Sequence, residues 1–485
     1  MNDVSANGHI VLVNPPSSME ERYGKLSAGG SHLPPLGLCC LAAVTRENGY
    51  STRIVDAIAL GLDYQEALSE LLKDSPRYVG LTASTITILN AARLAQLVKE
   101  HDSGIVVMIG GSHITAVPEE TMERFPQFDI GVVGEGEETI IDLLETYNRG
   151  ISLEKVNGII YRDNGRLRLT AKRDYIKDLD SLPMPAWDLL PYLPKYYRPA
   201  AQSVKRLPST SIVTARGCPG KCTFCDRKVF GNRCRGLSAG YVMRMIRNLY
   251  SEYGIRDLQI DDDTFMVFKR RMVEICEALI QEKLDLSWCC LARVDHVNPE
   301  VLQLMKRAGC WQIQYGVESG SQEILDVLKK GTSLEQIEQA IRWTKEAGIN
   351  SKGFFMIGHP LETEETINQT IEFAKKLALD DFQMTFLTPF PGCEFYEVAS
   401  EYGTFNYDWA KMNEYNVTFI PSGLTEEILV KYHKKAFREF YLRPRIILSY
   451  LKRMRRGRLV FLLGSVALSF LRTFAFTGGR KAVRD

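Results

Sequence analysis

The chain has 485 residues, of which 45% are hydrophobic and 25% charged, and its formal net charge is +1. This composition is ordinary for a globular protein, and the length allows two domains with a smaller third part. A disulfide-rich secreted domain and a membrane-spanning protein are both disfavoured, because the eleven cysteines are irregularly spaced and no apolar run reaches roughly 20 residues. No signal peptide is expected in the polar residues 1–8, so the sequence predicts a cytoplasmic protein.

Residues 1–150 predict an α/β domain built on a doubly wound parallel sheet. Short apolar runs that suit buried strands alternate with amphipathic segments that suit helices, such as residues 64–73 and 88–100. The expected strands are residues 10–13, 52–55, 78–81, 105–109 and 130–133. Ligands of such sheets bind beyond the carboxyl ends of the strands. We therefore expect a binding rim formed by the small and polar residues 14–16, 82–85, 110–112 and 134–136.

Residues 151–204 predict a connector. The Asn164-Gly165 pair between two strand-like runs is typical of a tight β-hairpin, which would span residues 158–167. Five prolines then follow within 17 residues, and they favour an extended, irregular linker.

A second α/β domain is predicted over residues 205–402. Apolar strand candidates again alternate with amphipathic helices, such as residues 272–281, 300–308 and 334–347. The strand candidates are residues 211–215, 258–261, 286–292, 313–316, 353–357 and 382–388. Six strand–helix units favour a partial (β/α)6 barrel whose site lies at the carboxyl ends of its strands. Residues 403–485 complete the chain as a basic, helical region.

Three cysteines follow the first strand of this second domain at a spacing that suits an iron–sulfur cluster. Cys218, Cys222 and Cys225 can surround one face of a [4Fe–4S] cube, whose usual ligands are four thiolates. Without a fourth cysteine ligand, one iron would stay open for a small chelating molecule. Two alternatives remain: a zinc site with Cys234 as its fourth ligand, and buried free cysteines of no special function.

The triplet, with Phe224 between its last two cysteines, resembles the signature of the radical-SAM superfamily. The resemblance implies that the open iron is chelated by S-adenosylmethionine. One electron passed through the cluster would then yield methionine and a 5′-deoxyadenosyl radical, which abstracts hydrogen from an unactivated carbon.

Further motifs of the same superfamily are matched at the ends of the following strands, in residues 261–265, 293–295, 316–320 and 356–360. By this resemblance the S-adenosylmethionine site comprises Phe224, Asp261, Asp263, Arg293, Glu318, Ser319 and Ile357. Each motif also has a simpler reading, because acidic residues after a strand commonly cap helices and an arginine can form a structural ion pair.

The first domain resembles the cobalamin-binding domain of corrinoid-dependent radical-SAM enzymes. Glycines at its strand ends would let the backbone approach a flat corrin ring. By this resemblance the cobalamin-binding residues are Asn14, Ser84, Thr85, Gly110, Gly111, Ser112, Gly134 and Glu135. The chain lacks the Asp-x-His-x-x-Gly loop that puts a histidine on cobalt elsewhere, and His113 is expected to pack near the rim. The alternative is a domain of this fold that holds no cofactor.

A nucleic-acid substrate is disfavoured. Methylthiotransferases of the same superfamily carry three further cluster cysteines in their N-terminal domain, whereas this region has only the pair Cys39-Cys40. They also usually end in a small β-barrel for RNA, whereas this chain is expected to end in helices.

The C-terminal region is strongly basic, with eleven Lys or Arg residues and no Asp or Glu between residues 440 and 484. Its basic residues 443–458 precede an apolar run, residues 459–471, that is too short to span a membrane as a helix. Two interpretations are open: a helix lying on anionic lipid at the inner membrane face, or a helix packed on the barrel.

Together these features predict an enzyme that uses a [4Fe–4S] cluster, S-adenosylmethionine and cobalamin on an unactivated carbon of a hydrophobic small molecule, such as a lipid, terpenoid or tetrapyrrole. The layout is similar to anaerobic magnesium-protoporphyrin IX monomethyl ester cyclases and hopanoid-modifying enzymes, which favours oxidation, cyclisation or rearrangement. A C-methyltransferase of a natural-product precursor is the alternative, and a non-catalytic sensor is a third. The enzyme would need an external one-electron reductant of the flavodoxin or ferredoxin type.

Overall fold

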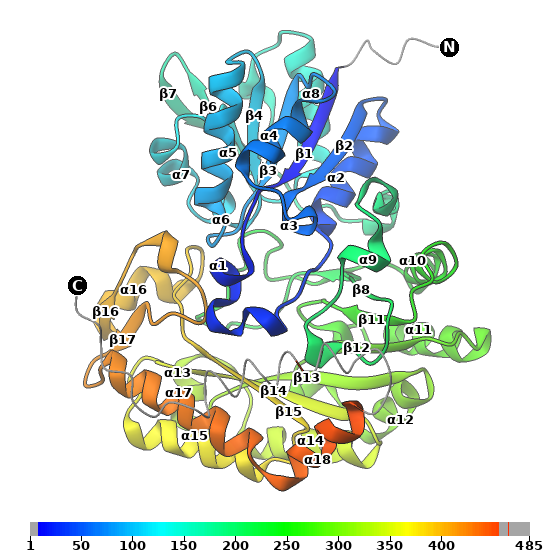
Figure 1. The fold of residues 1–485 in the computed structure, drawn as a ribbon, viewed down its shortest axis with the longest axis vertical. Helices are drawn as coiled ribbons and strands as arrows, with labels where there is room; N and C mark the ends of the chain where they lie inside the picture. The colour runs from blue at the N-terminus through cyan, green and yellow to red at the C-terminus, as the bar shows by residue number, and fades with distance from the viewer. Residues whose placement is uncertain (1–7, 455–463, 465–485) are drawn as a thin grey trace.

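Two parallel sheets dominate the computed structural model, which describes residues 8–454 and Gly464. In Figure 1 the N-terminal sheet and its helices form the upper part of the molecule, and the second sheet forms the lower part. The short helix α1 (Met19–Tyr23) lies between them. The predicted α/β class with two successive parallel sheets is therefore confirmed.

The N-terminal sheet has seven strands in the order β2-β1-β3-β4-β5-β6-β7. The five predicted strands are present and parallel: β1 (His9–Asn14), β2 (Ser51–Asp56), β3 (Tyr78–Thr82), β4 (Val106–Gly110) and β5 (Ile130–Val132). The helices between and after them are α2 (Leu36–Glu47), α3 (Ala57–Leu60), α4 (Tyr64–Leu72), α5 (Ile88–His101), α6 (Ser112–Ala116), α7 (Pro118–Arg124) and α8 (Glu137–Asn148).

Alternate residues of β1 pack against opposite layers of helices. Ile10 and Leu12 share a core with α2 and α8, whereas Val11 and Val13 share a core with α4 and α5. All four side chains are at most 1% exposed. A strand that is buried on both faces needs a continuous apolar run, which explains the unbroken hydrophobic segments of this sheet.

The predicted hairpin is present and extends the N-terminal sheet. Its strands β6 (Ile159–Asp163) and β7 (Arg166–Leu169) are joined by Asn164 and Gly165, which both have the positive φ of a tight turn. β6 pairs with β5 in antiparallel direction and buries its first three residues. The sheet therefore continues past residue 150, where the sequence placed a boundary, because the apolar side of the hairpin covers the edge of β5.

The second sheet is an open half-barrel of six parallel strands in the order β15-β14-β13-β12-β11-β8. The six predicted strands are confirmed as β8 (Ser209–Ile212), β11 (Asp257–Ile260), β12 (Ser287–Ala292), β13 (Cys310–Glu318), β14 (Asn350–Ile357) and β15 (Asp381–Phe386). β8 ends sooner than predicted, because the chain leaves it to form β9 (Ala215–Arg216), which pairs with β10 (Arg235–Gly236). The helices are α9 (Leu193–Tyr196), α10 (Ala239–Glu252), α11 (Lys269–Glu282), α12 (Pro299–Arg307), α13 (Gln322–Val327), α14 (Leu334–Glu346), α15 (Glu364–Lys376) and α16 (Glu394–Tyr402).

The C-terminal region packs on the half-barrel. It begins with an antiparallel pair that the sequence did not predict, β16 (Gly403–Phe405) and β17 (Phe419–Pro421). α17 (Glu426–Tyr441) then lies along α15 and β15, where Phe440 stacks on Phe382 with ring centroids 4.8 Å apart. α18 (Pro444–Met454) follows. The apolar run 459–471 lies outside the described residues, and within the described part no helix is long and apolar enough to cross a membrane.

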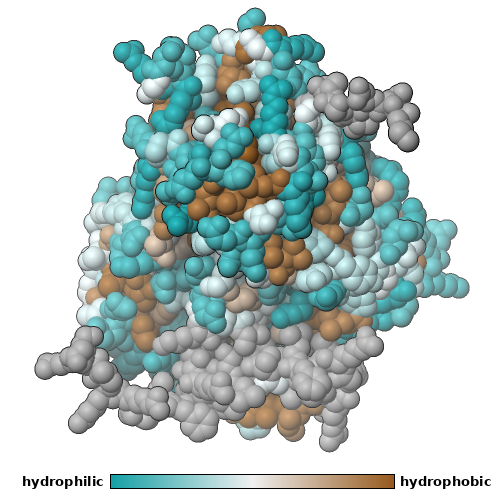
Figure 2. Space-filling model, turned by 45° about the horizontal axis from the view of Figure 1, so that its top comes forward, coloured by the Kyte–Doolittle hydropathy of each residue, from teal (hydrophilic) through white to brown (hydrophobic). Residues whose placement is uncertain are grey.

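The surface is mostly hydrophilic in the view of Figure 2, where apolar side chains gather in separate patches. Among the described residues, the large hydrophobic side chains that are more than half exposed are Tyr192, Leu361, Leu448 and Leu451. The last two lie on α18, which gives this helix an exposed apolar side.

Candidate cofactor site between the two sheets

One cavity of about 380 Å³ lies between the carboxyl ends of the N-terminal strands and the end of β8, the first strand of the half-barrel. The N-terminal domain lines it with its strand-end residues 110–112 and 134–136 and with parts of α2 and α8. The half-barrel lines it with residues 213–216, Phe230 and Tyr241. Ligands of parallel α/β sheets bind at this edge, so the cavity joins the binding edge of the N-terminal sheet to the end of one half-barrel strand.

The three cysteines lie in the loop 217–234, which β9 and β10 close at its base. A Cβ on Gly220 would lie 3.4 Å from the Sγ of Cys218 and 3.9 Å from the Sγ of Cys222, so these sulfur atoms converge on one glycine. Cys225 is accessible to solvent, yet burial by the surrounding protein raises the pKa of its thiol to about 12. Cys225 is thus surrounded by protein but still reached by solvent. We call the space beside Cys218, Cys222 and Cys225 the recess.

Two cations border this recess and offset the charge of a thiolate-bound cluster. Burial raises the pKa of the Cys222 thiol, whereas Lys330 and Arg293 lower it. Cys234, the fourth ligand of the zinc alternative, donates a hydrogen bond from its thiol to the carbonyl of Gly217 at 2.9 Å. Among the residues that the structure describes, no three His, Cys, Asp or Glu side chains meet closely enough to hold a single metal ion. Three thiols beside two cations fit a [4Fe–4S] cluster with one iron left open.

Glu318 ends β13 and forms a buried ion pair with Lys330. Its Oε1 lies 2.6 Å from the Lys330 Nζ, and both side chains are less than 10% exposed. The φ angle of Glu318 is +67°, which is costly for a residue with a side chain and must be held by its surroundings. A Cβ on Gly316 would clash with this carboxylate, so only glycine leaves room for the pair. A carboxylate beside the cysteines, on a residue whose backbone is held in a strained conformation, suits recognition of a polar ligand.

The acidic residues after β11 have different environments. Asp262 is 1% exposed and accepts a hydrogen bond from the Ala215 N–H at 2.9 Å, so it fixes the turn between β8 and β9. Asp261 and Asp263 keep accessible surface, and burial raises the pKa of both carboxyls, that of Asp261 to about 6. The Asp261 carboxylate also accepts a hydrogen bond from the side-chain amide of Gln259. A contact of these two carboxyls with S-adenosylmethionine therefore stays a prediction.

Arg293 forms the structural ion pair that the sequence offered as its simpler reading. Its guanidinium donates two hydrogen bonds of 3.0 Å to the carboxylate of Asp295 and one of 3.1 Å to the carbonyl of Lys330. The same guanidinium borders the cysteines, since one of its nitrogens lies 3.5 Å from the Cβ position of Gly220. Phe224 lies beside it, partly buried, with the Lys330 Nζ 6.0 Å from its ring centroid.

Two residues of the expected S-adenosylmethionine site direct their side chains away from the recess. Ser319 is 0% exposed, and its hydroxyl is hydrogen-bonded to the hydroxyl of Thr370 at 3.1 Å. Ile357 is 0% exposed and packs in the core of the half-barrel. Neither residue has accessible surface, so a contact of its side chain with S-adenosylmethionine is not supported.

The glycines of the N-terminal rim provide the open edge that a flat ring needs. A Cβ on Gly110 or Gly134 would meet no described atom within 4 Å. Gly111 differs, because its φ is +109° and a Cβ would lie 2.5 Å from the carbonyl oxygen of Ala83. Ser112 begins α6 beside them and also lines the cavity. Gly111 is thus required by the fold, and the φ of +90° at Gly134 also favours glycine. Gly110 and Gly134 both leave space that a corrin could occupy.

Three further predicted residues of the rim, Asn14, Ser84 and Thr85, lie outside this cavity. Asn14 and Ser84 line a second, smaller cavity of about 180 Å³. Thr85 is buried with its hydroxyl 3.0 Å from the Nδ1 of His113, so this hydroxyl is not available to a corrin. His113 is 0% exposed, burial lowers its pKa to about 3, and its ring packs edge-on against Trp409. It is a packing residue, as expected.

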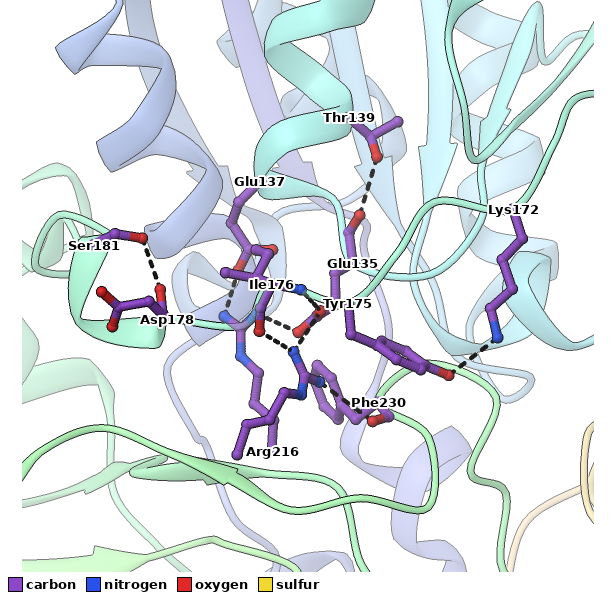
Figure 3. Close-up of polar contacts among 11 residues, drawn as sticks. Glu135, Glu137, Thr139, Lys172, Tyr175, Ile176, Asp178, Ser181, Arg216 and Phe230 are labelled. Carbon is purple, nitrogen blue, oxygen red and sulfur yellow. Dashed lines mark hydrogen bonds and ion pairs between the residues drawn. The ribbon is translucent and has the colours of Figure 1, made fainter.

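Glu135 lines the cavity, but its carboxylate is already occupied. Its two oxygens lie 2.7 Å from nitrogens of Arg216 and Arg235 in the half-barrel, and Glu137 binds the other side of Arg216. Figure 3 shows the carboxylates of the N-terminal domain and the guanidinium of Arg216 directed at one another. A direct contact of the Glu135 carboxylate with cobalamin is therefore not supported.

Sequence reasoning missed several charged residues of the site. Lys330, Arg216 and Arg235 belong to no motif, and nothing in the sequence links them to the acids that they bind. Glu414 is another: its side chain is accessible, yet burial and then the nearby Glu318 raise its pKa. Its carbonyl accepts a hydrogen bond from the Phe386 N–H at 2.9 Å, which holds it at the end of β15.

Known proteins share this architecture. The sequence matches the Radical SAM superfamily over residues 212–374 and the B12 binding domain over residues 26–144. An uncharacterized methyltransferase of Pyrococcus horikoshii is 35% identical over 442 residues, which cover 91% of this chain and 94% of the relative. The anaerobic magnesium-protoporphyrin IX monomethyl ester cyclase of Rubrivivax gelatinosus is 28% identical and covers 86% of this chain and 76% of its own. The structure of the cobalamin-dependent S-adenosylmethionine radical enzyme OxsB has a TM-score of 0.72 at 18% identity, covering 96% of this chain and 75% of that chain.

The half-barrel, its cysteine loop and the preceding sheet define a radical-SAM enzyme with an N-terminal B12-binding domain. The chain belongs to the radical SAM superfamily, in the group that includes these methyltransferase and cyclase relatives. The radical-SAM domain implies a [4Fe–4S] cluster and S-adenosylmethionine, and the B12-binding domain implies cobalamin. A non-catalytic sensor is not supported, because the matched relatives are enzymes.

Replacing Cys218, Cys222 or Cys225 by alanine should abolish cluster assembly, because two thiolates are too few to hold the cube. After anaerobic reconstitution the wild type should hold about four iron atoms per chain and release 5′-deoxyadenosine with a strong reductant, and the variants should do neither. Cys234→Ala, from the same loop, is the matched control and should do both. Iron analysis and chromatography of 5′-deoxyadenosine check this. Cleavage of S-adenosylmethionine by a triple-alanine variant would contradict the assignment.

Replacing Gly110 by leucine should weaken cobalamin binding at least about tenfold, or about 1.4 kcal/mol, because the new side chain would fill open cavity space. The melting temperature should stay near that of the wild type, since a Cβ there meets no described atom. Gly111→Ala should instead destabilise the fold by about 1–3 kcal/mol, because of its positive φ. Absorption titration with hydroxocobalamin and thermal unfolding separate the two effects. Unchanged cobalamin affinity in Gly110→Leu would remove Gly110 from the site.

Proposed function

We propose that the protein is a cobalamin-dependent radical-SAM methyltransferase acting on an unactivated carbon of a hydrophobic small molecule. The shared cavity carries this proposal, because the open glycine rim and the strand that leads into the cysteine loop border the same space. A cobalamin at the rim and an S-adenosylmethionine at the loop would therefore face one substrate. The Pyrococcus relative, matched over 94% of its length, is a methyltransferase and supports the same reading.

Some residues of the chain would bind the cofactors, and others would orient them. When bound, the cluster and S-adenosylmethionine supply a radical, and cobalamin supplies a methyl group. Cys218, Cys222 and Cys225 would hold the cluster and leave one iron for the ligand. Glu318, fixed by Lys330, would accept hydrogen bonds from the polar groups of S-adenosylmethionine. Apolar side chains of β1, β4, α2 and α8 that line the cavity would exclude water from it.

Radical oxidation or cyclisation without net methylation is the second candidate. The cyclase of Rubrivivax gelatinosus matches 86% of this chain, and its name gives a magnesium-protoporphyrin IX monomethyl ester as its substrate. Both candidates need the same cluster, so the residues that hold it do not separate them. The fate of the methyl group of S-adenosylmethionine does.

S-adenosylmethionine that carries a trideuteromethyl group should distinguish the two candidates without a known substrate. A methyltransferase has to pass this group to its cobalamin, so reconstituted protein with hydroxocobalamin and a strong reductant should give methylcobalamin that carries the three deuterium atoms of the label. Mass spectrometry of the corrinoid fraction checks this. The Cys222→Ala variant controls for label transfer that bypasses the cluster. Release of 5′-deoxyadenosine with no label in the corrinoid would favour oxidation or cyclisation.

The electron would come from outside the chain. We propose a flavodoxin or ferredoxin in the cytoplasm as its donor, because Cys225 keeps accessible surface and gives the cluster loop a route to solvent. A small molecule remains the proposed substrate, and no nucleic acid is proposed.

α18 supports a peripheral contact with anionic lipid as a further part of this proposal. Leu448 is 57% exposed and Leu451 is 52% exposed, and one helical turn brings them to the same side. In the sequence, Lys452 and Arg453 follow directly. Apolar side chains flanked by basic ones suit the boundary between lipid head groups and acyl chains.

The double variant Leu448→Asp/Leu451→Asp should bind anionic vesicles at least about tenfold more weakly than the wild type, because it removes apolar area and adds two negative charges. Its melting temperature should be unchanged, since both side chains are exposed. Leu169→Asp, at an equally exposed position on β7, is the matched control. Sedimentation with vesicles of phosphatidylserine and phosphatidylcholine, at low and high salt, measures the binding. A wild-type protein that does not bind these vesicles would contradict the membrane proposal.

A further inference from the structure

We propose that Glu135 is a positioning residue that ties the cobalamin-binding rim to the loop that carries the cluster cysteines. The inference rests on the proposed function, which assigns cobalamin to the rim and the cluster to the loop. Its consequence is that each cofactor favours the binding of the other through one carboxylate.

The loop and the carboxylate meet at the base of the loop. Arg216 and Arg235 are register partners in β9 and β10, so they stand at the two ends of the loop 217–234. Glu135 binds both arginines: its Oε1 lies 2.7 Å from a nitrogen of Arg216, and its Oε2 lies 2.7 Å from a nitrogen of Arg235. A third hydrogen bond, of 2.9 Å, comes from the Ile176 N–H. One side chain of the N-terminal domain thus holds both ends of a loop in the other domain.

Burial makes this contact firm. The side chain of Glu135 is 2% exposed, and those of Arg216 and Arg235 are 12% and 13% exposed. Charge-assisted hydrogen bonds with so little water around them are stronger than the same bonds at the surface. Glu137 also binds Arg216, so Glu135 is the one carboxylate that binds Arg235 among the described residues. Loss of Glu135 would leave that guanidinium buried without an acidic partner.

The contact reaches both proposed cofactor sites. Glu135 and Arg216 line the cavity, and Glu135 directly follows Gly134, whose missing side chain leaves the rim open. Arg216 precedes Cys218 by two residues, and Arg235 donates to the carbonyl of Phe230 inside the loop at 3.3 Å. A corrin that orders the rim would therefore also order the loop. Coupling between two binding sites is reciprocal, so an assembled cluster should tighten cobalamin binding by the same factor.

The test compares full-length wild type, Glu135→Gln and a control, each prepared with and without the reconstituted cluster. The dissociation constant for hydroxocobalamin is measured by absorption titration in both forms, and iron release to a chelator is followed over time. Asp188→Asn is the matched control, because it breaks an ion pair with Arg46 that is about half exposed and far from the loop in sequence. Glu135→Gln/Arg235→Gln removes the unpaired guanidinium and separates folding damage from loss of the contact.

In the wild type the cluster should tighten hydroxocobalamin binding about tenfold, within the roughly 5- to 150-fold usual for coupled sites. Glu135→Gln should bring this ratio close to one and release iron faster, whereas Asp188→Asn should keep both wild-type values. The double variant should recover the melting temperature but not the ratio. Wild-type coupling in Glu135→Gln or in the double variant would overturn the proposal.

The two proposals can fail separately. If the wild type bound no hydroxocobalamin, the proposed function would be wrong, and iron release would decide the role of Glu135. In that case, iron release as slow in Glu135→Gln as in Asp188→Asn would overturn the positioning role of Glu135. Faster iron release in Glu135→Gln at an equal melting temperature would support that role.

Discussion

The direction of the strands is the constraint on which the rest of the site depends. Parallel strands need crossover helices, and this requirement collects all their carboxyl ends at one edge of each sheet. Here the edge of the N-terminal sheet and the end of β8 border one cavity, to which the N-terminal sheet contributes glycines and the half-barrel contributes residues 213–216. The cysteine loop begins directly after those residues, so a bound cobalamin and a cluster would be neighbours by topology rather than by any special linker.

Charge pairing between separate elements then holds this arrangement in place. Glu318 is paired with Lys330, Asp262 with Arg271, and Glu135 with two arginines of the other domain. Each carboxylate is less than 10% exposed, so removing its cation would leave a buried charge, at a cost of about 3–5 kcal/mol. Such pairs would help the recess to hold a negatively charged cluster in two ways. They fix the walls of the recess, and they place cations near the sulfur ligands.

The sequence predicted what depends on local patterns, and it failed where distant segments meet. Apolar runs and helix periodicity located the eleven strands of the two predicted domains, and the cysteine spacing located the loop. The turn pair Asn164-Gly165 predicted the hairpin, but not that the hairpin would join the sheet. Ser319, Ile357 and Thr85 matched motifs by position, yet their side chains are buried against neighbours that are 28 or more residues away or in the core. No local pattern shows which way a side chain points at the end of a strand.

The C-terminal segment adds a layer that neither domain motif describes. The amide of Asn413 donates to the carbonyl of Glu21 at 3.2 Å, and Trp409 packs on His113, so this segment contacts the N-terminal domain. It also contacts the half-barrel, where Glu414 is held at the end of β15 within electrostatic reach of Glu318. Radical generation depends on the strand ends and the cysteine loop, which the superfamily shares. The C-terminal segment lies beyond both matched domains. The two domains are therefore held together in part by contacts of residues that neither family model includes.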